Sequence, residues 1–229
     1  MFESSSLRYH RAGPSELGKP WSAHRHVLAM IPPRSRILEI GCSTGYLTRH
    51  LAQHLCCQVV AVESDPAAAE LARPEATALL VGDIESPEIL GQVCERQYDV
   101  ILLAAVLEHL RRPDIVLSRI AQELAPNGRV IISLPNVAHW SVRWGLMRGK
   151  FQYEDTGLLD RTHLHLFTRK TARELIAECG LHVEAERVTS MPPCMRLFQH
   201  LPRVASLTGR LAPSLVGYEL IYQAARASS

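Results

Sequence analysis

The sequence has no dominant charge. Its 229 residues include 25 lysines and arginines against 23 aspartates and glutamates, which gives a formal net charge of +2. A strongly basic balance is typical of chains that bind nucleic acid or anionic membranes through electrostatic attraction. Because that balance is absent, we expect no nucleic-acid partner.

Long apolar runs are also absent. The longest, residues 100–107, is far shorter than the roughly 20 residues that a helix needs to cross a bilayer. The opening residues carry no secretory leader, which would be basic and then apolar. We therefore expect no stable membrane insertion and a cytoplasmic location.

Cysteine spacing typical of zinc or redox sites is missing as well. None of the six cysteines forms a C-x-x-C pair, and two of them are adjacent. We interpret them as reduced, mostly buried, small apolar residues. They are Cys42, Cys56, Cys57, Cys94, Cys179 and Cys194.

The sequence does contain enough apolar residues, 47%, for one sizeable core. Strand-like apolar runs alternate with helical segments, the pattern of a parallel sheet covered by helices on both faces. We predict a single α/β domain over residues 1–229 with a doubly wound sheet. It divides into an N-terminal arm and helix (1–31), a cofactor-binding half (32–135), and an acceptor-side lid with the final strands (136–229).

The boundaries of the predicted elements follow from these runs and from the proline and glycine residues between them. Strands are expected at 36–40, 58–62, 77–81, 98–104, 129–134, 182–188 and 218–224. Helices are expected at 21–31, 46–55, 66–72, 86–96, 113–124, and from Thr168 to just before Gly180. Pro126-Asn127-Gly128 is interpreted as closing the helix before the fifth strand.

The first strand runs into a glycine-bearing turn that opens a helix, Arg36-Ile-Leu-Glu-Ile-Gly-Cys-Ser-Thr-Gly45. Gly41 and Gly45 allow a tight turn and a close approach of the backbone to a ligand, beside the unpaired N–H groups of the helix. A dinucleotide fingerprint would need glycine at 43 and 46, where Ser43 and Tyr46 stand, so an NAD site is not predicted. The second strand ends in Glu63, about 20 residues after the loop, where a carboxylate can accept both ribose hydroxyls.

The spacing Glu39-x-Gly41-x-x-x-Gly45 resembles the first signature of class I S-adenosylmethionine methyltransferases, which more often have glycine in place of Ser43. Val81-Gly82-Asp83-Ile84, the run from Tyr98 to Leu110, and Leu124 to Gly128 resemble the signatures that follow it. The resemblance implies a seven-stranded Rossmann-like mixed sheet, its last two strands antiparallel, and S-adenosylmethionine as cofactor. It implies a carboxylate of Asp83 on the adenine amino group and an apolar Ile84 on the ring. The cofactor-binding residues expected are Glu39, Gly41, Cys42, Ser43, Gly45, Tyr46, Glu63, Ser64, Asp83, Ile84 and Ala104.

A segment dense in polar and aromatic residues, 149–168, lies beyond the cofactor half. It resembles a segment of a bacterial subfamily linked to cell-surface glycans and secondary metabolites, related more distantly to ubiquinone-pathway O-methyltransferases. The resemblance implies O-methylation of a small-molecule or glycan hydroxyl in a biosynthetic pathway. An N- or C-methyltransferase, or a non-catalytic cofactor-binding partner protein, is the alternative. The connection 189–216 is interpreted as a packed lid. The alternatives are that it lines an acceptor pocket, docks a partner subunit as in a homodimer, or rests on a membrane surface.

A hydroxyl acceptor gains from a positioned base, usually histidine near neutral pH. We select His163 as the catalytic base, because Asp160 beside it could fix its tautomer, and His139 as the second candidate. The alternative is that Asp160 and His163 only tie the lid to the following helix.

Glu108, His109 and His163 also resemble part of the metal site of RNA 3′-terminal 2′-O-methyltransferases. Ala105 stands where that family has its first glutamate, so one ligand is missing. We therefore expect no metal site, and we rank an ion held by three residues below the general base.

Overall fold

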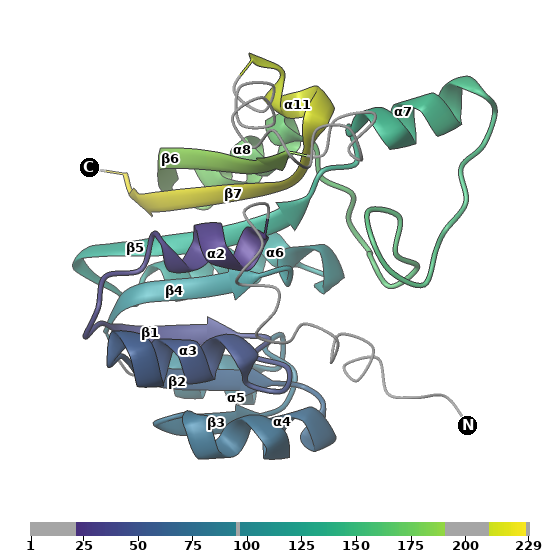
Figure 1. Ribbon diagram of the computed structural model, residues 1–229. Helices are drawn as coiled ribbons and strands as arrows, with labels where there is room; N and C mark the ends of the chain where they lie inside the picture. The colour runs from purple at the N-terminus through teal and green to yellow at the C-terminus, as the bar shows by residue number, and fades with distance from the viewer. Residues whose placement is uncertain (1–21, 95–96, 191–210, 228–229) are drawn as a thin grey trace.

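The computed structural model describes residues 22–94, 97–190 and 211–227. They form a seven-stranded sheet in the order β3-β2-β1-β4-β5-β7-β6 (Figure 1). The strands are β1 (Arg36–Ile40), β2 (Gln58–Glu63), β3 (Ala78–Val81), β4 (Tyr98–Ala104), β5 (Leu124–Pro135), β6 (Leu181–Ser190) and β7 (Gly217–Arg226).

The sheet is mixed, as predicted. Strands β1 to β5 pair in parallel, whereas β7 is antiparallel to both β5 and β6. The strand order reverses between β1 and β4, which is where doubly wound sheets bind ligands.

Helices cover both faces because side chains of a strand alternate between them. Ile37 and Leu102 face one core, shared with α2 (Ala23–Leu28), α3 (Tyr46–Leu55) and the end of α4 (Pro66–Ala72). Leu38 and Leu103 face the other, larger core, shared with α5 (Pro87–Val93), α6 (Pro113–Ala121) and α8 (Arg169–Glu178). In Figure 1, α2 and α3 lie in front of the sheet and α8 lies behind it. Short helices complete the described chain: η2 (Arg73–Glu75), η3 (Leu107–His109), α7 (Trp140–Met147) and α11 (Pro213–Val216).

Most predicted elements are found, with several boundaries moved. Helices α2, α5 and α6 are shorter than predicted, and β6 and β7 are longer. Pro126-Asn127-Gly128 lies inside β5 rather than after a helix, in an irregular stretch between the pairs Tyr98↔Leu124 and Val100↔Arg129. Thr168 is the N-cap of α8, as predicted, in a capping box with Thr171.

One helix was not predicted, and some of the residues considered in the sequence lie outside the described part of the chain. Helix α7 was not predicted, and it stands away from the sheet in Figure 1. The N-terminal arm, Trp21 and Cys194 lie outside the described residues. Within the described ranges, no helix is both long and apolar enough to cross a membrane.

Candidate active site

A cavity of about 280 Å³ lies beside the carboxyl ends of β1 and β4. Six of the predicted cofactor residues line it: Glu39, Gly41, Cys42, Ser43, Tyr46 and Ala104. Its lining also includes Glu108, His109, His163, Tyr218 and Glu219, among others. One cavity therefore joins the glycine-bearing loop to the candidate catalytic histidine.

The loop between β1 and α3 has a left-handed backbone at three positions, with φ of 73° at Gly41, 49° at Ser43 and 78° at Gly45. A Cβ on Gly41 would lie 2.7 Å from Cγ2 of Val106, and one on Gly45 would lie 2.7 Å from Cα of Ala72. Both positions therefore require glycine. Ser43 adopts the same backbone at a cost of roughly 1–2 kcal/mol, and its side chain lines the cavity without closing it.

Glu63 ties this loop to the end of β2. Its buried carboxylate accepts the backbone N–H of Ser43 at 2.8 Å through Oε2. Oε1 accepts the N–H of Asp65 at 2.9 Å and the hydroxyl of Ser64 at 3.3 Å. A carboxylate has about four acceptor positions, so these bonds leave capacity for a ligand hydroxyl. Glu63 and Ser64 are not among the residues that line the cavity, although Glu63 bonds to the lining residue Ser43.

Glu39 and Cys42 are buried on the cavity wall. The pKa of Glu39 is raised to about 7 by burial, although Oε2 accepts a hydrogen bond from Oγ1 of Thr48 at 2.7 Å. Burial also raises the pKa of the Cys42 thiol, with Glu39 and Glu63 adding to the effect. Cys42 is therefore a neutral thiol, consistent with its predicted role as a small apolar residue.

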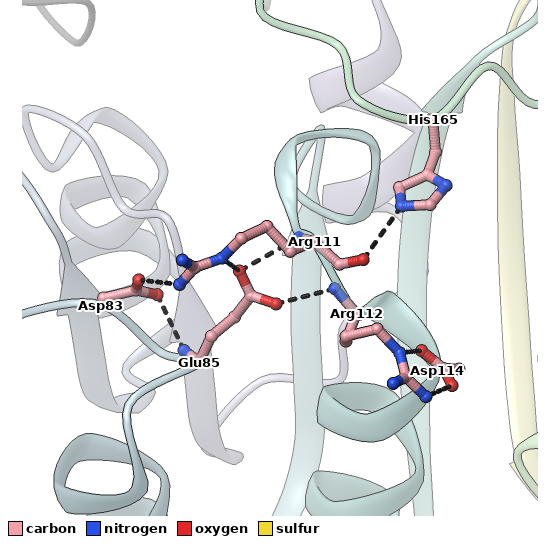
Figure 2. A network of polar contacts seen from close by, with 6 residues as sticks. All are labelled: Asp83, Glu85, Arg111, Arg112, Asp114 and His165. Atoms are coloured by element: carbon pink, nitrogen blue, oxygen red, sulfur yellow. Dashed lines mark hydrogen bonds and ion pairs between the residues drawn. The ribbon is translucent and has the colours of Figure 1, made fainter.

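Asp83, the predicted adenine acid, does not line the cavity but belongs to a surface network (Figure 2). Its Oδ2 lies 3.1 Å from Nη2 of Arg111, and its Oδ1 accepts the N–H of Glu85 at 2.8 Å. Glu85 in turn accepts the backbone N–H groups of Arg111 and Arg112 at 3.0 and 2.7 Å. The network joins the loop after β3 to the loop after η3. Ile84 is buried in the larger core.

The acceptor end of the cavity contains a buried carboxyl group. Glu108 is 1% exposed, and its Oε2 has no hydrogen-bond partner within the described residues. Burial raises its pKa to about 8, to which Glu219 and Asp160 contribute. The backbone carbonyl of Glu108 accepts the N–H groups of Leu164 and His165 at 2.8 and 3.1 Å. These bonds hold the segment around Leu164 and His165, called the lid segment below, against η3.

His163 lies at this end of the cavity, as predicted, but Asp160 does not bond to its Nδ1. Nδ1 of His163 is buried and has no partner among the residues that the structure describes. Asp160 instead accepts the backbone N–H and the hydroxyl of Thr162 through Oδ1, at 2.8 and 2.7 Å. The rings of His109 and His163 stand edge to face, with centroids 4.9 Å apart. Burial lowers the pKa of His163, and the nearby His109 lowers it further.

His139, the second candidate base, is buried outside the cavity lining. It caps the N-terminus of α7, where its Nδ1 accepts the N–H of Ser141 at 3.4 Å and lies 2.8 Å from the Ser141 hydroxyl. Its ring packs against Tyr218, with centroids 5.5 Å apart. The geometry gives His139 a structural role in the start of α7.

His24, Tyr218 and Glu219 also line the cavity, although the sequence analysis did not select them. Antiparallel pairing sets Glu219 opposite Pro135 at the carboxyl end of β5. Burial raises the pKa of Glu219 to about 7 and that of Tyr218 above its usual value. No local pattern marks Tyr218 and Glu219, because their place depends on the register of the last strand, whereas His24 comes from α2.

Comparison with known proteins finds similarity along most of the chain. Residues 14–186 match the family model described as a methyltransferase domain. A mitochondrial ubiquinone biosynthesis O-methyltransferase of Schizosaccharomyces pombe is 33% identical over 102 residues, 43% of this chain and 37% of that protein. A malonyl-[acyl-carrier protein] O-methyltransferase of Priestia megaterium is 34% identical over 102 residues, 42% of this chain and 35% of that protein. The matched region thus spans little more than one third of either relative.

Solved structures share the fold at low identity. A SAM-dependent methyltransferase from Archaeoglobus fulgidus has a TM-score of 0.64 at 16% identity, covering 89% of this chain and 91% of that one. Magnesium protoporphyrin IX methyltransferase from Synechocystis, solved with bound SAH, has a TM-score of 0.58 at 16% identity, covering 90% and 81%.

Proposed function

The chain belongs to the S-adenosylmethionine-dependent methyltransferase family, and on that premise we propose that it methylates a hydroxyl oxygen of a small molecule or glycan. One observation carries the proposal: a single cavity joins the glycine-bearing loop to Glu108, His109 and His163. The O-methyltransferases among its relatives support oxygen as the acceptor atom.

The residues present fit the family's cofactor, S-adenosylmethionine. It carries a positive sulfonium and an ammonium group, and three carboxyl side chains line the cavity: Glu39, Glu108 and Glu219. Gly41 lines the cavity and would let the backbone approach the cofactor closely. Glu63 would hold the ribose, whereas Asp83 would bind the adenine amino group once it turns from Arg111.

When bound, the cofactor supplies a methyl group on an electron-poor sulfur. The new O–C bond forms as the S–C bond breaks, and the hydroxyl loses its proton. Alignment of the two reacting atoms supplies much of the acceleration in such a displacement. The residues of this chain that can assist departure of the proton are Glu108, His109 and His163, which meet at the far end of the cavity.

A methyl-transfer screen tests this function. The purified chain is incubated with isotopically labelled S-adenosylmethionine and a panel of phenols, sugar hydroxyls, amines and carbon acids. We expect label in an O-methyl product, identified by mass spectrometry and NMR. Label only on nitrogen or carbon would overturn the assignment of oxygen. Binding of S-adenosylhomocysteine without transfer to any compound isolated from the source cells would indicate a non-catalytic binding protein.

A further inference from the structure

Three side chains at the acceptor end converge on one point. Glu108 and His109 come from η3, and His163 comes from the lid segment. One potential ligand atom from each residue lies within 4.8 Å of the corresponding atoms of the other two. Two ligand atoms that each lie about 2.0–2.2 Å from one divalent ion can be at most about 4.4 Å apart, so small side-chain rotations would bring all three atoms onto one ion.

Two of the three ligand groups are buried without a hydrogen-bond partner within the described residues. They are Oε2 of Glu108 and Nδ1 of His163. A buried polar atom left unpaired destabilises the fold, and a charged one does so more strongly. Such atoms in a native structure call for an unseen partner, such as water or an ion. That both belong to the same cluster points to one shared partner.

Backbone groups lie beside both imidazole rings. Nδ1 of His109 lies 3.2 Å from the carbonyl oxygen of Thr162, so this nitrogen carries the proton and Nε2 carries the lone pair. The backbone of Leu158 lies near the His163 ring, and Nδ1 is a buried ring nitrogen without a partner in the described residues, so its lone pair is available to an ion. Histidines that bind metals usually donate their other N–H in this way to a carbonyl or carboxylate. Asp160 completes the arrangement by holding Thr162.

We propose that Glu108, His109 and His163 hold a divalent transition-metal ion, of the Zn²⁺ or Mn²⁺ class, at the acceptor end of the cavity. Two imidazoles favour such an ion over Mg²⁺ or Ca²⁺, which prefer oxygen ligands. Three protein ligands with further positions open to solvent are typical of catalytic zinc sites. This proposal reverses the ranking drawn from Ala105, which placed an ion held by these three residues below a general base.

The catalytic part of the inference rests on the proposed function. The acceptor hydroxyl would occupy an open position on the ion, which lowers the hydroxyl pKa and lets its proton pass to water. The oxygen then forms the bond to the methyl carbon as the S–C bond breaks. In this arrangement Nδ1 of His163 is a ligand, whereas a metal-free enzyme would use the same lone pair as a general base.

The test measures ion binding directly. The full chain is treated with a chelator, dialysed and titrated with Zn²⁺, Mn²⁺ and Co²⁺ by calorimetry, and the Co²⁺ complex is followed by visible absorption. We expect one ion per chain and a Co²⁺ spectrum typical of mixed nitrogen and oxygen ligands. Glu108→Gln and His163→Ala should each weaken binding by at least about 100-fold. Thr162→Val removes the hydroxyl that lies 3.3 Å from Nδ1 of His109 and donates to Asp160, so it should weaken binding by about 10–100-fold.

His165→Ala is the matched control, because His165 lies in the same lid segment but bonds to the carbonyl of Arg111. It should bind the ion like the wild type, and circular dichroism of every variant checks its fold. No stoichiometric ion, or equal affinity in folded Glu108→Gln and His163→Ala, would overturn the proposal. So would full methyl transfer after complete chelation, with loss of the acidic limb of the pH profile in His163→Ala, which would identify a general base. Ion binding without transfer to any acceptor would leave this site standing and refute the proposed function instead.

Discussion

Glu63 is the residue whose removal should lower cofactor affinity most directly. Its carboxylate is expected to bind the ribose and already holds the backbone of Ser43. Hydrogen bonds to a charged group are worth about 1.5–3 kcal/mol each. Glu63→Ala should therefore weaken the binding of S-adenosylhomocysteine by roughly 10-fold to more than 100-fold in calorimetry.

The matched control for this change is Glu70→Ala, because Glu70 is exposed and pairs only with the neighbouring helix residue Arg73 in the described contacts. It should bind the ligand like the wild type. A folded Glu63→Ala variant with wild-type affinity would show that Glu63 is not the ribose acid.

Glu39 should make stability depend on pH. Its pKa is raised from 4.5 to about 7 in the folded state, so the folded chain binds this proton more tightly than the unfolded chain. The contribution is fully present below about pH 4.5 and is lost as the pH rises through about 7. Each pKa unit corresponds to about 1.4 kcal/mol, which makes the change on the order of a few kcal/mol.

Urea unfolding of the ligand-free chain at pH 5 and pH 8 measures this effect. The free energy of unfolding should fall between the two values in the wild type and fall less in Glu39→Gln, whose amide stays neutral. Glu108 and Glu219 also have raised pKa values, so part of the dependence should remain. An identical decrease in the wild type and Glu39→Gln would contradict the raised pKa.

The sequence predicted the site residues on the loop between β1 and α3 better than the site residues that come from distant parts of the chain. The loop residues line the cavity because local spacing and the strand before them determine their place. His139 could not be separated from His163 by the same means, since only the formation of α7 turns His139 into a helix cap. Tyr218 and Glu219 depend on strand register, which no short motif encodes.

Among the elements, the start of α3 depends on the absence of a side chain at Gly45. Gly45→Ala should destabilise the chain, because φ is +78° and the new Cβ would lie 2.7 Å from the Cα of Ala72. The left-handed backbone alone costs roughly 1–2 kcal/mol, and the clash with α4 adds to it. A decrease of about 2 kcal/mol or more in the free energy of unfolding is expected in urea titrations.

Gly91→Ala provides the opposite control. Gly91 lies within α5, and a Cβ there would meet no atom within 4 Å. Alanine should therefore stabilise the chain by about 0.5–1 kcal/mol. Equal effects of the two substitutions would show that the contact between Gly45 and Ala72 is not the cause.

Element boundaries were predicted well where caps and breakers coincide and poorly elsewhere. Thr168 and Gly180 frame α8 as expected. Helix α7 buries only Val142 and contains Gly145, so its sequence carries little helical periodicity. The proline, asparagine and glycine inside β5 resemble a turn sequence, and they fall in the irregular stretch between the pairs Tyr98↔Leu124 and Val100↔Arg129.

In the molecule as a whole, Asn136 joins the end of β5 to the start of β7. Its buried amide donates to the carbonyl oxygens of Gly217 and Ser214 at 2.7 and 3.2 Å and accepts the N–H of Ala138 at 3.1 Å. Asn136→Ala would leave these groups unpaired, so a loss of about 1–3 kcal/mol is expected in chemical unfolding.

Gln53→Ala is the control that tests whether Asn136→Ala lowers the free energy of unfolding because the Asn136 amide is buried. Gln53 is exposed and donates to Glu75 on the surface, so its loss should stay within about 0.5 kcal/mol. Stability of Asn136→Ala within the same range would show that the amide does not hold the two strands together.

The position of β7 constrains the order in which the sheet can be completed during synthesis. A ribosome makes β6 before β7, yet β7 lies between β5 and β6, and β6 joins the sheet through it. Strand β7 therefore reaches β5 only after β6 has been made, either alone or already paired with β6. Until it does, β5 presents an open edge, which favours pairing with other chains. Tyr218 and Glu219 belong to the same strand. Pairing of β7 with β5 therefore covers the open edge of β5 and adds these two residues to the cavity lining at the same time.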